Sequence, residues 1–267
     1  MQKTPPGMFS AGDAYERFMG RWSRKLAPAL VQFAGVRDGD SVLDVGCGTG
    51  ALAAAAAAIG PSVQVSGVDP SAAYVTAAAR RHGTDRVRFR VGDARELPFP
   101  AASFDRTLSL LILNFVPEPG AAVDQMIRVT RPGGTVAAAV WDYAGGMEML
   151  RTFWDEAIAL RPEMDSRDER HMRFSTAGEL AALWRARGLR DVVETSLVID
   201  MPFASFDDYW QPFLAGQGPA GVFIAALPDA AREQLRERLA HRLTGTTTGA
   251  TISMQGRAWA VRGEVVG

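Results

Sequence analysis

The sequence predicts an α/β fold built on a doubly wound, seven-stranded, mostly parallel sheet. Between residues 41 and 141, short apolar runs alternate with segments of helical periodicity, which is typical of parallel strands joined by right-handed crossovers. A glycine-rich turn follows the first apolar run, as in ligand-binding sheets of this class. The composition, 47% hydrophobic and 22% charged over 267 residues, is that of a folded globular chain.

The first half of the chain predicts helices and then strand–helix units. Apolar residues recur at helical spacing between residues 15 and 33, and Gly20 interrupts them, so we expect two helices there. An alanine-rich segment from residue 51 has the highest helix propensity of the chain. The remaining periodic segments predict strands at 41–46, 63–69, 87–92, 104–111 and 135–141, and helices at 72–82 and 121–129.

Beyond residue 141 the alternation weakens. We expect helices at 147–160 and 176–187, a charged loop at 161–173, a strand at 192–201, two or three helices within 203–243, and a final edge strand within 250–265. These elements divide the chain into an N-terminal helical cap (1–36), a core (37–202), a helical insertion (203–247) and a returning edge strand (248–267). The insertion is either a lid over a pocket or a structural appendage such as a dimer contact.

Charge and composition exclude several classes of function. The formal net charge of −1 indicates no nucleic-acid surface. A single cysteine, Cys47, forbids an internal disulfide, and three scattered histidines lack metal-ligand spacing, so we expect no metal. No stretch approaches the roughly 20 apolar residues that cross a bilayer. We therefore expect a cytoplasmic protein with no membrane partner, as a monomer or a homodimer.

The glycine-rich turn predicts a ligand that carries an amine. Gly46, Gly48 and Gly50 stand between strand and helix, where a bare backbone admits close approach of a ligand. Their G-x-G-x-G spacing differs from the G-x-G-x-x-G of dinucleotide sites, and Asp44 precedes them. A carboxylate there would repel a pyrophosphate and attract a cationic amine. A nicotinamide dehydrogenase is therefore disfavoured, and a turn without a ligand is the remaining alternative.

Two further carboxylates follow the next two predicted strands. Asp69 ends the second strand, where a carboxylate can accept both hydroxyls of a ribose. Asp93 follows the third strand and could accept a hydrogen bond from an adenine amine, although alone it would be a loop or capping residue. Because parallel strands bring their carboxyl ends to one sheet edge, the three aspartates together predict an adenosine-type ligand.

These segments resemble those of the class I S-adenosylmethionine-dependent methyltransferases. Residues 44–50 are similar to the family's glycine motif, 68–71 to its ribose-binding loop and 92–99 to its adenine-contacting segment, with further matches at 103–105 and 131–135. The matches span about residues 41–143 in order. Within the family the chain most resembles the type 11 branch, which includes quinone-biosynthesis C-methyltransferases and mostly acts on small molecules. The resemblance implies the Rossmann-like methyltransferase fold.

The resemblance also implies S-adenosyl-L-methionine as the cofactor. Its methionine part would lie on Asp44 and the glycine turn, its ribose on Asp69 and its adenine on Asp93. The N-terminal cap would reach the cofactor carboxylate, although for Arg21 a solvated surface position is the alternative. The implied cofactor-binding set is Tyr15, Arg21, Asp44, Gly46, Cys47, Gly48, Gly50, Asp69, Pro70, Asp93, Ala94 and Leu110.

The catalytic residues are expected after the fourth and fifth strands. Methyl transfer by in-line displacement needs alignment and exclusion of water, and a base only where the acceptor must lose a proton. Many relatives carry a histidine after the fourth strand, where this chain has Asn114, which can orient an acceptor but cannot take a proton. Asp142 is a candidate base or a group that binds a cationic acceptor, and a helix cap or an exposed loop residue is the alternative. Tyr143 and Trp210 would line an aromatic pocket or simply pack in the core.

We therefore expect a methyltransferase that transfers a methyl group to an O, N or C atom of a small molecule. A macromolecular methyltransferase acting on RNA or protein remains an alternative. No Asn-Pro-Pro-Tyr-like motif follows the fourth strand, which disfavours DNA bases as acceptors, and no basic tail or RNA-binding module indicates RNA. A protein that binds the cofactor without catalysis is the third alternative, because the acceptor side has no diagnostic residue.

Overall fold

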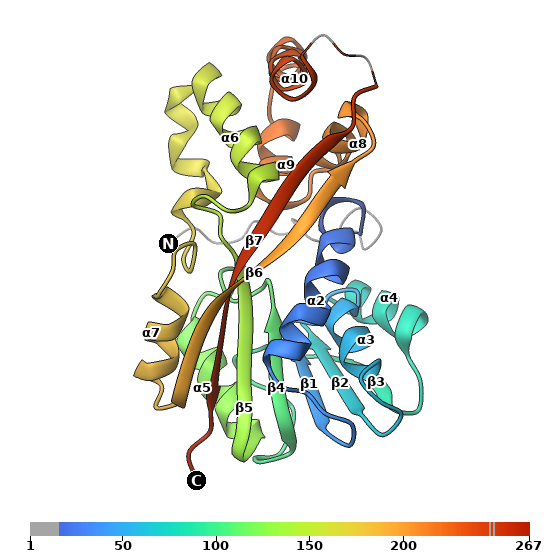
Figure 1. The fold of residues 1–267 in the computed structure, drawn as a ribbon, viewed down its shortest axis with the longest axis vertical. Helices are drawn as coiled ribbons and strands as arrows, with labels where there is room; N and C mark the ends of the chain where they lie inside the picture. The colour runs from blue at the N-terminus through green and yellow to red at the C-terminus, as the bar shows by residue number, and fades with distance from the viewer. Residues whose placement is uncertain (1–15, 246, 248) are drawn as a thin grey trace.

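A seven-stranded mixed sheet forms the centre of the molecule (Figure 1). The computed structural model describes residues 16–245, 247 and 249–267. The strand order is β3-β2-β1-β4-β5-β7-β6; the five strands from β3 to β5 are parallel, and β7 is antiparallel to both of its neighbours. The expected fold class is therefore confirmed. The strands are β1 (Ser41–Val45), β2 (Gln64–Asp69), β3 (Val87–Val91), β4 (Phe104–Leu110), β5 (Thr130–Trp141), β6 (Arg190–Phe203) and β7 (Ile252–Glu264).

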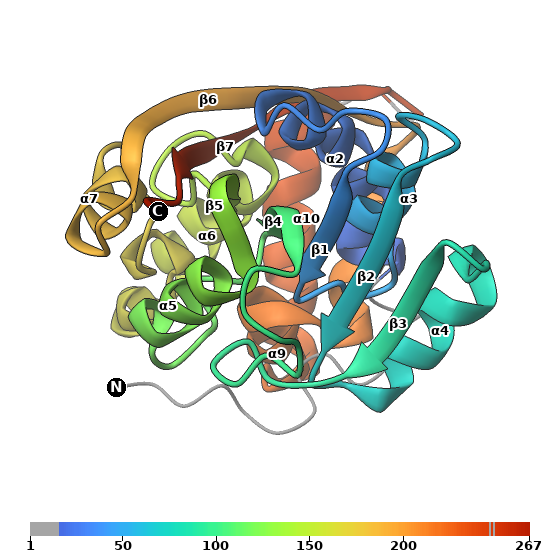
Figure 2. The same cartoon turned by 90° about the horizontal axis from the view of Figure 1, so that it is seen from below.

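Helices cover both faces of the sheet (Figure 2). The connections through α3 (Ala51–Ala57) and α4 (Ala72–His82) move outward from β1 to β3, whereas the connection through α5 (Pro119–Val129) moves from β4 to β5. Right-handed crossovers in opposite directions lie on opposite faces. The direction reverses between β1 and β4, and this switch point at the carboxyl ends of the strands is where such sheets bind ligands.

The N-terminal cap consists of a π-helical turn, η1 (Glu16–Gly20), that continues into α2 (Arg21–Phe33). The two segments meet at Gly20, where the sequence predicts a break. Trp22, Leu26 and Leu30 form the buried stripe of α2, which packs against α3 and the sheet. Tyr15 lies outside the described residues.

The last strand corrects one expectation. The prediction that it lies at the sheet edge is wrong, because β7 lies between β5 and β6, and β6 is the edge. Residues 258–262 and Glu264 pair with both neighbouring strands, whereas residues 252–257 pair with no other strand than β6. Buried residues alternate with less buried ones from residue 252 to residue 260, through the part where the β6–β7 ribbon continues beyond the end of β5 and into the part that pairs with β5. The alternation around Trp259, which predicts the strand, does not show its place in the sheet, because this part of β7 pairs with both β5 and β6.

The helical insertion forms an aromatic layer above the sheet that is continuous with the main hydrophobic core. It contains α8 (Phe206–Trp210), η4 (Gln211–Ala215), α9 (Gly218–Ala225) and α10 (Asp229–Thr244), and it packs on α6 (Glu148–Leu160). Phe213 of η4 stacks on Phe153 of α6 with ring centroids 4.7 Å apart and meets Phe18 of the cap at 5.4 Å. Trp210 is buried in this core.

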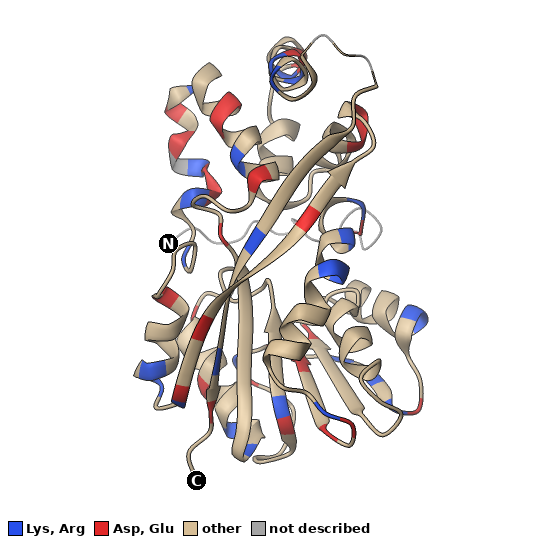
Figure 3. Ribbon diagram, viewed as in Figure 1, with Lys and Arg blue, Asp and Glu red and all other residues tan. Residues whose placement is uncertain are grey.

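Residues 161–186, between α6 and β6, form a less regular segment. The expected loop at 161–173 contains two 3₁₀ turns, η2 (Pro162–Arg167) and η3 (Glu169–His171), and is followed by α7 (Glu179–Ala186). Positive and negative side chains are interspersed over the helices and loops (Figure 3). In the described part of the chain, no helix is long and apolar enough to span a membrane.

Candidate active site

The glycine turn after β1 adopts a conformation that favours glycine at each of its three positions. Gly46, Gly48 and Gly50 have φ values of +75°, +50° and +94°. The N–H groups of Gly46 and Cys47 both donate to the Val68 carbonyl, at 2.8 and 3.0 Å, which ties the turn to the end of β2. A Cβ on Gly48 would meet no protein atom within 4 Å. The turn is therefore fixed to β2 by its N–H groups, and the space beside Gly48 is free for a ligand.

Asp44 is buried beneath this turn with one carboxylate oxygen left over. Its Oδ2 accepts a hydrogen bond of 3.0 Å from the Ala53 N–H, whereas its Oδ1 is buried without a hydrogen-bond partner. Burial, reinforced by the nearby charge of Asp69, raises the pKa of Asp44 to about 8. A buried acceptor without a donor costs about 1–3 kcal/mol. Oδ1 is therefore a site for a ligand donor, most favourably a cationic one.

Asp69, at the tip of β2, holds the turn from the other side. Its Oδ2 accepts from the Gly48 N–H and its Oδ1 from the Ser71 N–H, each at 2.9 Å. Burial raises the pKa of Asp69 above its usual value, and the two N–H donors oppose that shift. Each oxygen keeps a second lone pair for a ligand hydroxyl.

Asp93 lies at the exposed end of the same edge. Arg95 binds its carboxylate through a 2.7 Å contact from Nη2, and this hydrogen bonding lowers the pKa of Asp93. The side chain of Asp93 is 44% exposed. A ligand that reaches from Asp44 to Asp93 would therefore run from a buried to a solvent-exposed end.

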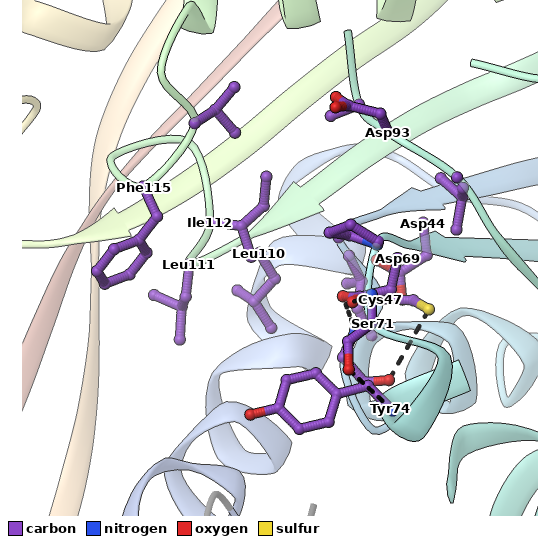
Figure 4. Close-up of a pocket in the computed structure, with 18 of the residues that line it drawn as sticks. Asp44, Cys47, Asp69, Ser71, Tyr74, Asp93, Leu110, Leu111, Ile112 and Phe115 are labelled. Atoms are coloured by element: carbon purple, nitrogen blue, oxygen red, sulfur yellow. Dashed lines mark hydrogen bonds between the residues drawn. The ribbon is translucent and has the colours of Figure 1, made fainter. Parts of the chain in front are cut away.

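A cavity of about 290 Å³ connects these three aspartates (Figure 4). Most of the residues predicted to bind the cofactor line it: Asp44, Gly46, Cys47, Gly48, Asp69, Pro70, Asp93, Ala94 and Leu110. Gly50 does not line it but starts α3 directly behind the turn. Ser23 and Tyr74 also line the cavity but were not predicted. They lie on helices, and no local sequence pattern indicates that these helices pack beside the cavity. Cys47 lines the turn, but burial raises the pKa of its thiol, which keeps it unreactive.

Arg21 lies away from this cavity. Its Nη1 is 2.8 Å from Asp208 Oδ1 in α8, and its guanidinium lies over the rings of Trp22 and Phe203, at 4.2 and 4.7 Å from their centroids. Arg21 thus joins the N-terminal cap to the insertion. It lies neither at the cofactor carboxylate nor on the solvated surface, the two positions that the sequence allowed.

The wall opposite the aspartates is apolar. It is formed by the segment after β4, namely Leu110, Leu111, Ile112, Phe115, Val116 and Pro117 (Figure 4). Leu111 has a φ of +64°, and its N–H donates to the Ala139 carbonyl at 2.8 Å, which turns the chain sharply away from the sheet. Sequence reasoning missed this wall apart from Leu110, although the apolar run at 110–113 was a usable signal.

The three catalytic candidates do not line the cavity. Asn114 is buried behind the apolar wall, where its Nδ2 donates to the Met172 sulfur at 3.4 Å and its Oδ1 has no partner. Asp142 is buried against Arg257, with a 2.6 Å contact to Nη2, and accepts from the Gly145 N–H at 2.9 Å. Tyr143 is buried beside it. Among the described residues of the apolar wall, none is titratable.

The cavity fits the cofactor that the resemblance implies. Its buried end offers an unpartnered carboxylate oxygen to an amine, its middle offers the Asp69 carboxylate to a diol, and the bare Gly48 leaves room between them. In the part of the chain that the structure describes, no group of three His, Cys, Asp or Glu side chains could hold a metal ion.

Comparison with known proteins finds similarity to the same family. The type 11 methyltransferase family model, described as a methyltransferase domain, matches residues 43–138. A 27-O-demethylrifamycin SV methyltransferase of Amycolatopsis mediterranei is 38% identical over 42% of this chain and 43% of its own length. A 2-methyl-6-phytyl-1,4-hydroquinone methyltransferase of Synechocystis is 29% identical over 71% of this chain and 60% of its own length.

Solved structures share the whole fold. A chain from the complex of the Haloferax volcanii Trm112 methyltransferase activator with a methyltransferase superposes with a TM-score of 0.62 and 22% identity, covering 99% of this chain and 100% of that one. The chain spans about half the length of the curated relatives it matches. Residues 43–138 thus match a methyltransferase domain, and S-adenosyl-L-methionine is the cofactor that the cavity fits.

Proposed function

We propose that the protein is an S-adenosylmethionine-dependent methyltransferase that acts on an O, N or C atom of a small, largely apolar molecule. The observation that carries the proposal is the buried, unpartnered Oδ1 of Asp44 at the closed end of a cavity that continues to Asp69 and Asp93. Fold alone does not determine function, so the proposal rests on these groups.

Each aspartate has one role in this proposal. Asp44 accepts a hydrogen bond from the amino group of the cofactor, and the backbone of Leu110 faces the same group. Asp69 accepts from the ribose hydroxyls, and Asp93 and Ala94 contact the adenine. When bound, the cofactor supplies an electrophilic methyl group. The glycine turn and the apolar wall hold and desolvate the two reactants.

The apolar wall supports a small acceptor with little charge. A charged acceptor would lose its hydration against Leu111, Ile112 and Phe115 without gaining a partner. The names of the relatives, methyltransferases of a demethylrifamycin and of a hydroquinone, support a small organic acceptor as well. Asn114 faces Met172 behind this wall, so the proposal gives it no contact with the acceptor. Asp142 is already paired with Arg257, so the proposal gives it no role as a base.

Calorimetry tests the cofactor assignment. We expect S-adenosylmethionine and S-adenosylhomocysteine to bind the wild-type protein and NAD not to bind. Binding of NAD alone would overturn the proposal. Transfer of labelled methyl groups to low-molecular-weight hydroquinones would support the small-molecule class, whereas transfer to RNA or protein alone would favour a macromolecular acceptor. Cofactor binding without any transfer would favour a non-catalytic role.

Replacing Asp69 with asparagine should weaken cofactor binding about 10- to 150-fold. The variant loses the charge assistance of the hydrogen bonds to the ribose, about 1.5–3 kcal/mol in total, while it keeps the shape of the side chain. The dissociation constant for S-adenosylhomocysteine measures the effect. Asp85→Asn, at an exposed aspartate between α4 and β3, is the matched control and should leave binding unchanged. Equal affinity in the two variants would refute the ribose role of Asp69.

A further inference from the structure

We infer that Glu16 occupies the position that the cofactor's amino-acid carboxylate takes when the cofactor binds, so that η1 is an internal competitor of the cofactor. The inference rests on the proposed function, because it concerns the same site. In this inference Arg24 and Arg81, and not Arg21, bind the carboxylate of the cofactor.

The Glu16 carboxylate lies where three donors from three elements converge. The Thr49 hydroxyl of the glycine turn donates to its Oε1, Arg81 Nη1 from α4 lies 3.1 Å from the same oxygen, and Arg24 Nη1 from α2 binds its Oε2. The Glu16 side chain is only 15% exposed. Two guanidinium groups and a hydroxyl around one carboxylate form a site for a carboxylate of any origin.

The local backbone is shaped to bring Glu16 into this position. The side chain folds back over Gly20, where an added Cβ would lie 2.6–2.7 Å from its three carboxyl atoms. Any residue other than glycine at position 20 would therefore push the carboxylate away. Glu16 and Gly20 are the ends of a single π-helical turn, a geometry that is rare and frequently found at functional sites.

This carboxylate site adjoins the buried end of the cavity. Thr49, which binds Glu16, lines the cavity, as does Ser23, the neighbour of Arg24 in α2. In an amino acid the carboxylate is two bonds from the amine. A ligand amine on Asp44 Oδ1 must therefore hold its carboxylate close to the glycine turn, where Thr49, Arg24 and Arg81 already bind the carboxylate of Glu16. Arg21 is held by Asp208.

Two carboxylates cannot share these donors, because like charges at contact distance repel. Cofactor binding would then require Glu16 to withdraw, and the fraction of molecules with Glu16 in place would lower the apparent affinity. This competition would couple cofactor binding to the position of the N-terminal cap, which also contacts the insertion through Phe18 and Phe213.

Calorimetry with two ligands tests the inference. S-adenosylhomocysteine carries the amino-acid group, whereas 5′-methylthioadenosine lacks it. Glu16→Gln should bind S-adenosylhomocysteine about 10-fold more tightly than wild type, the order expected for one charge-assisted contact, and 5′-methylthioadenosine equally. Adding Arg24→Met to Glu16→Gln should weaken only S-adenosylhomocysteine, by about 10-fold. Glu237→Gln, on the exposed side of α10, is the control and should change neither.

The outcomes separate the inference from the proposed function. Unchanged or weaker binding of S-adenosylhomocysteine to Glu16→Gln would overturn the competitor role. An equal change for both ligands would also overturn it, because the effect would then not depend on the carboxylate. Binding of 5′-methylthioadenosine to each variant shows that the variant is folded. If wild type bound neither ligand, the proposed function itself would fail.

Discussion

Replacing Gly48 with valine will abolish cofactor binding in a protein that still folds. Gly48 has a φ of +50°, and a Cβ on it would project into the cavity, since no protein atom lies within 4 Å of that position. The β-branched side chain would fill space that the ligand needs beside Asp69, which binds the Gly48 N–H. We expect affinity for S-adenosylhomocysteine to fall more than 100-fold by calorimetry, about 3 kcal/mol or more.

Gly39→Val provides the matched control for backbone strain. Gly39 also has a positive φ, +91°, with no atom within 4 Å of an added Cβ, but it lies in the turn before β1. Both variants should lower the melting temperature, because valine is strained at a positive φ. Only Gly48→Val should lose the ligand. A folded Gly48→Val protein with wild-type affinity would show that the glycine turn is not the cofactor site.

Cofactor affinity will rise steeply with pH up to about 8. In the free protein, burial raises the pKa of Asp44 to about 8, so the carboxyl is protonated at neutral pH. Binding an ammonium group requires the ionised form, so binding releases a proton. The dissociation constant should fall by up to about 10-fold per pH unit below 8 and then level off, or about 100-fold between pH 6 and 8.

Asp44→Asn should remove this pH dependence and bind the cofactor weakly at every pH. Calorimetry in buffers of different ionisation enthalpy measures the released proton directly. Asp124→Asn, which alters an exposed aspartate on α5 paired with Arg187, should keep the wild-type profile. A wild-type dissociation constant that does not vary between pH 6 and 8 would contradict the role of Asp44.

The same shift predicts a change in stability. The folded pKa of Asp44 exceeds the unfolded value of 3.8, so its favourable contribution is complete below about pH 4 and is lost as pH rises through 8. At about 1.36 kcal/mol per unit, the loss amounts to roughly 5–6 kcal/mol. Glu169, buried against Trp154 with its pKa raised to about 7, acts in the same direction. The melting temperature of the ligand-free protein should therefore fall between pH 5 and 8, and less so in Asp44→Asn.

The contacts of the catalytic candidates could not be predicted from the sequence. Asp142 follows β5 in the expected position, but its partner Arg257 lies in β7, which no local pattern connects to it. Asn114 likewise faces Met172, from the segment after η3, instead of the cavity. Side chains at strand ends can turn toward or away from a cavity, and their partners from distant segments decide which.

Two arginines of α2 likewise differ in their contacts because of packing against distant segments. Arg21 and Arg24 are about one helical turn apart, so sequence spacing does not distinguish them. The packing of α2 against α3 and β6 turns Arg21 toward Asp208 and Arg24 toward Glu16 beside the glycine turn.

Sequence patterns alone predict the sheet, the glycine turn and the line of three aspartates, because parallel strands bring their consecutive ends to one edge. The side chains from distant segments that complete this edge become known from the folded chain: the apolar wall after β4, the pairing of Asp142 with Arg257 and the position of Glu16. Local patterns reflect the periodicity of a segment, whereas these contacts depend on how separate segments pack, which no short stretch of chain specifies.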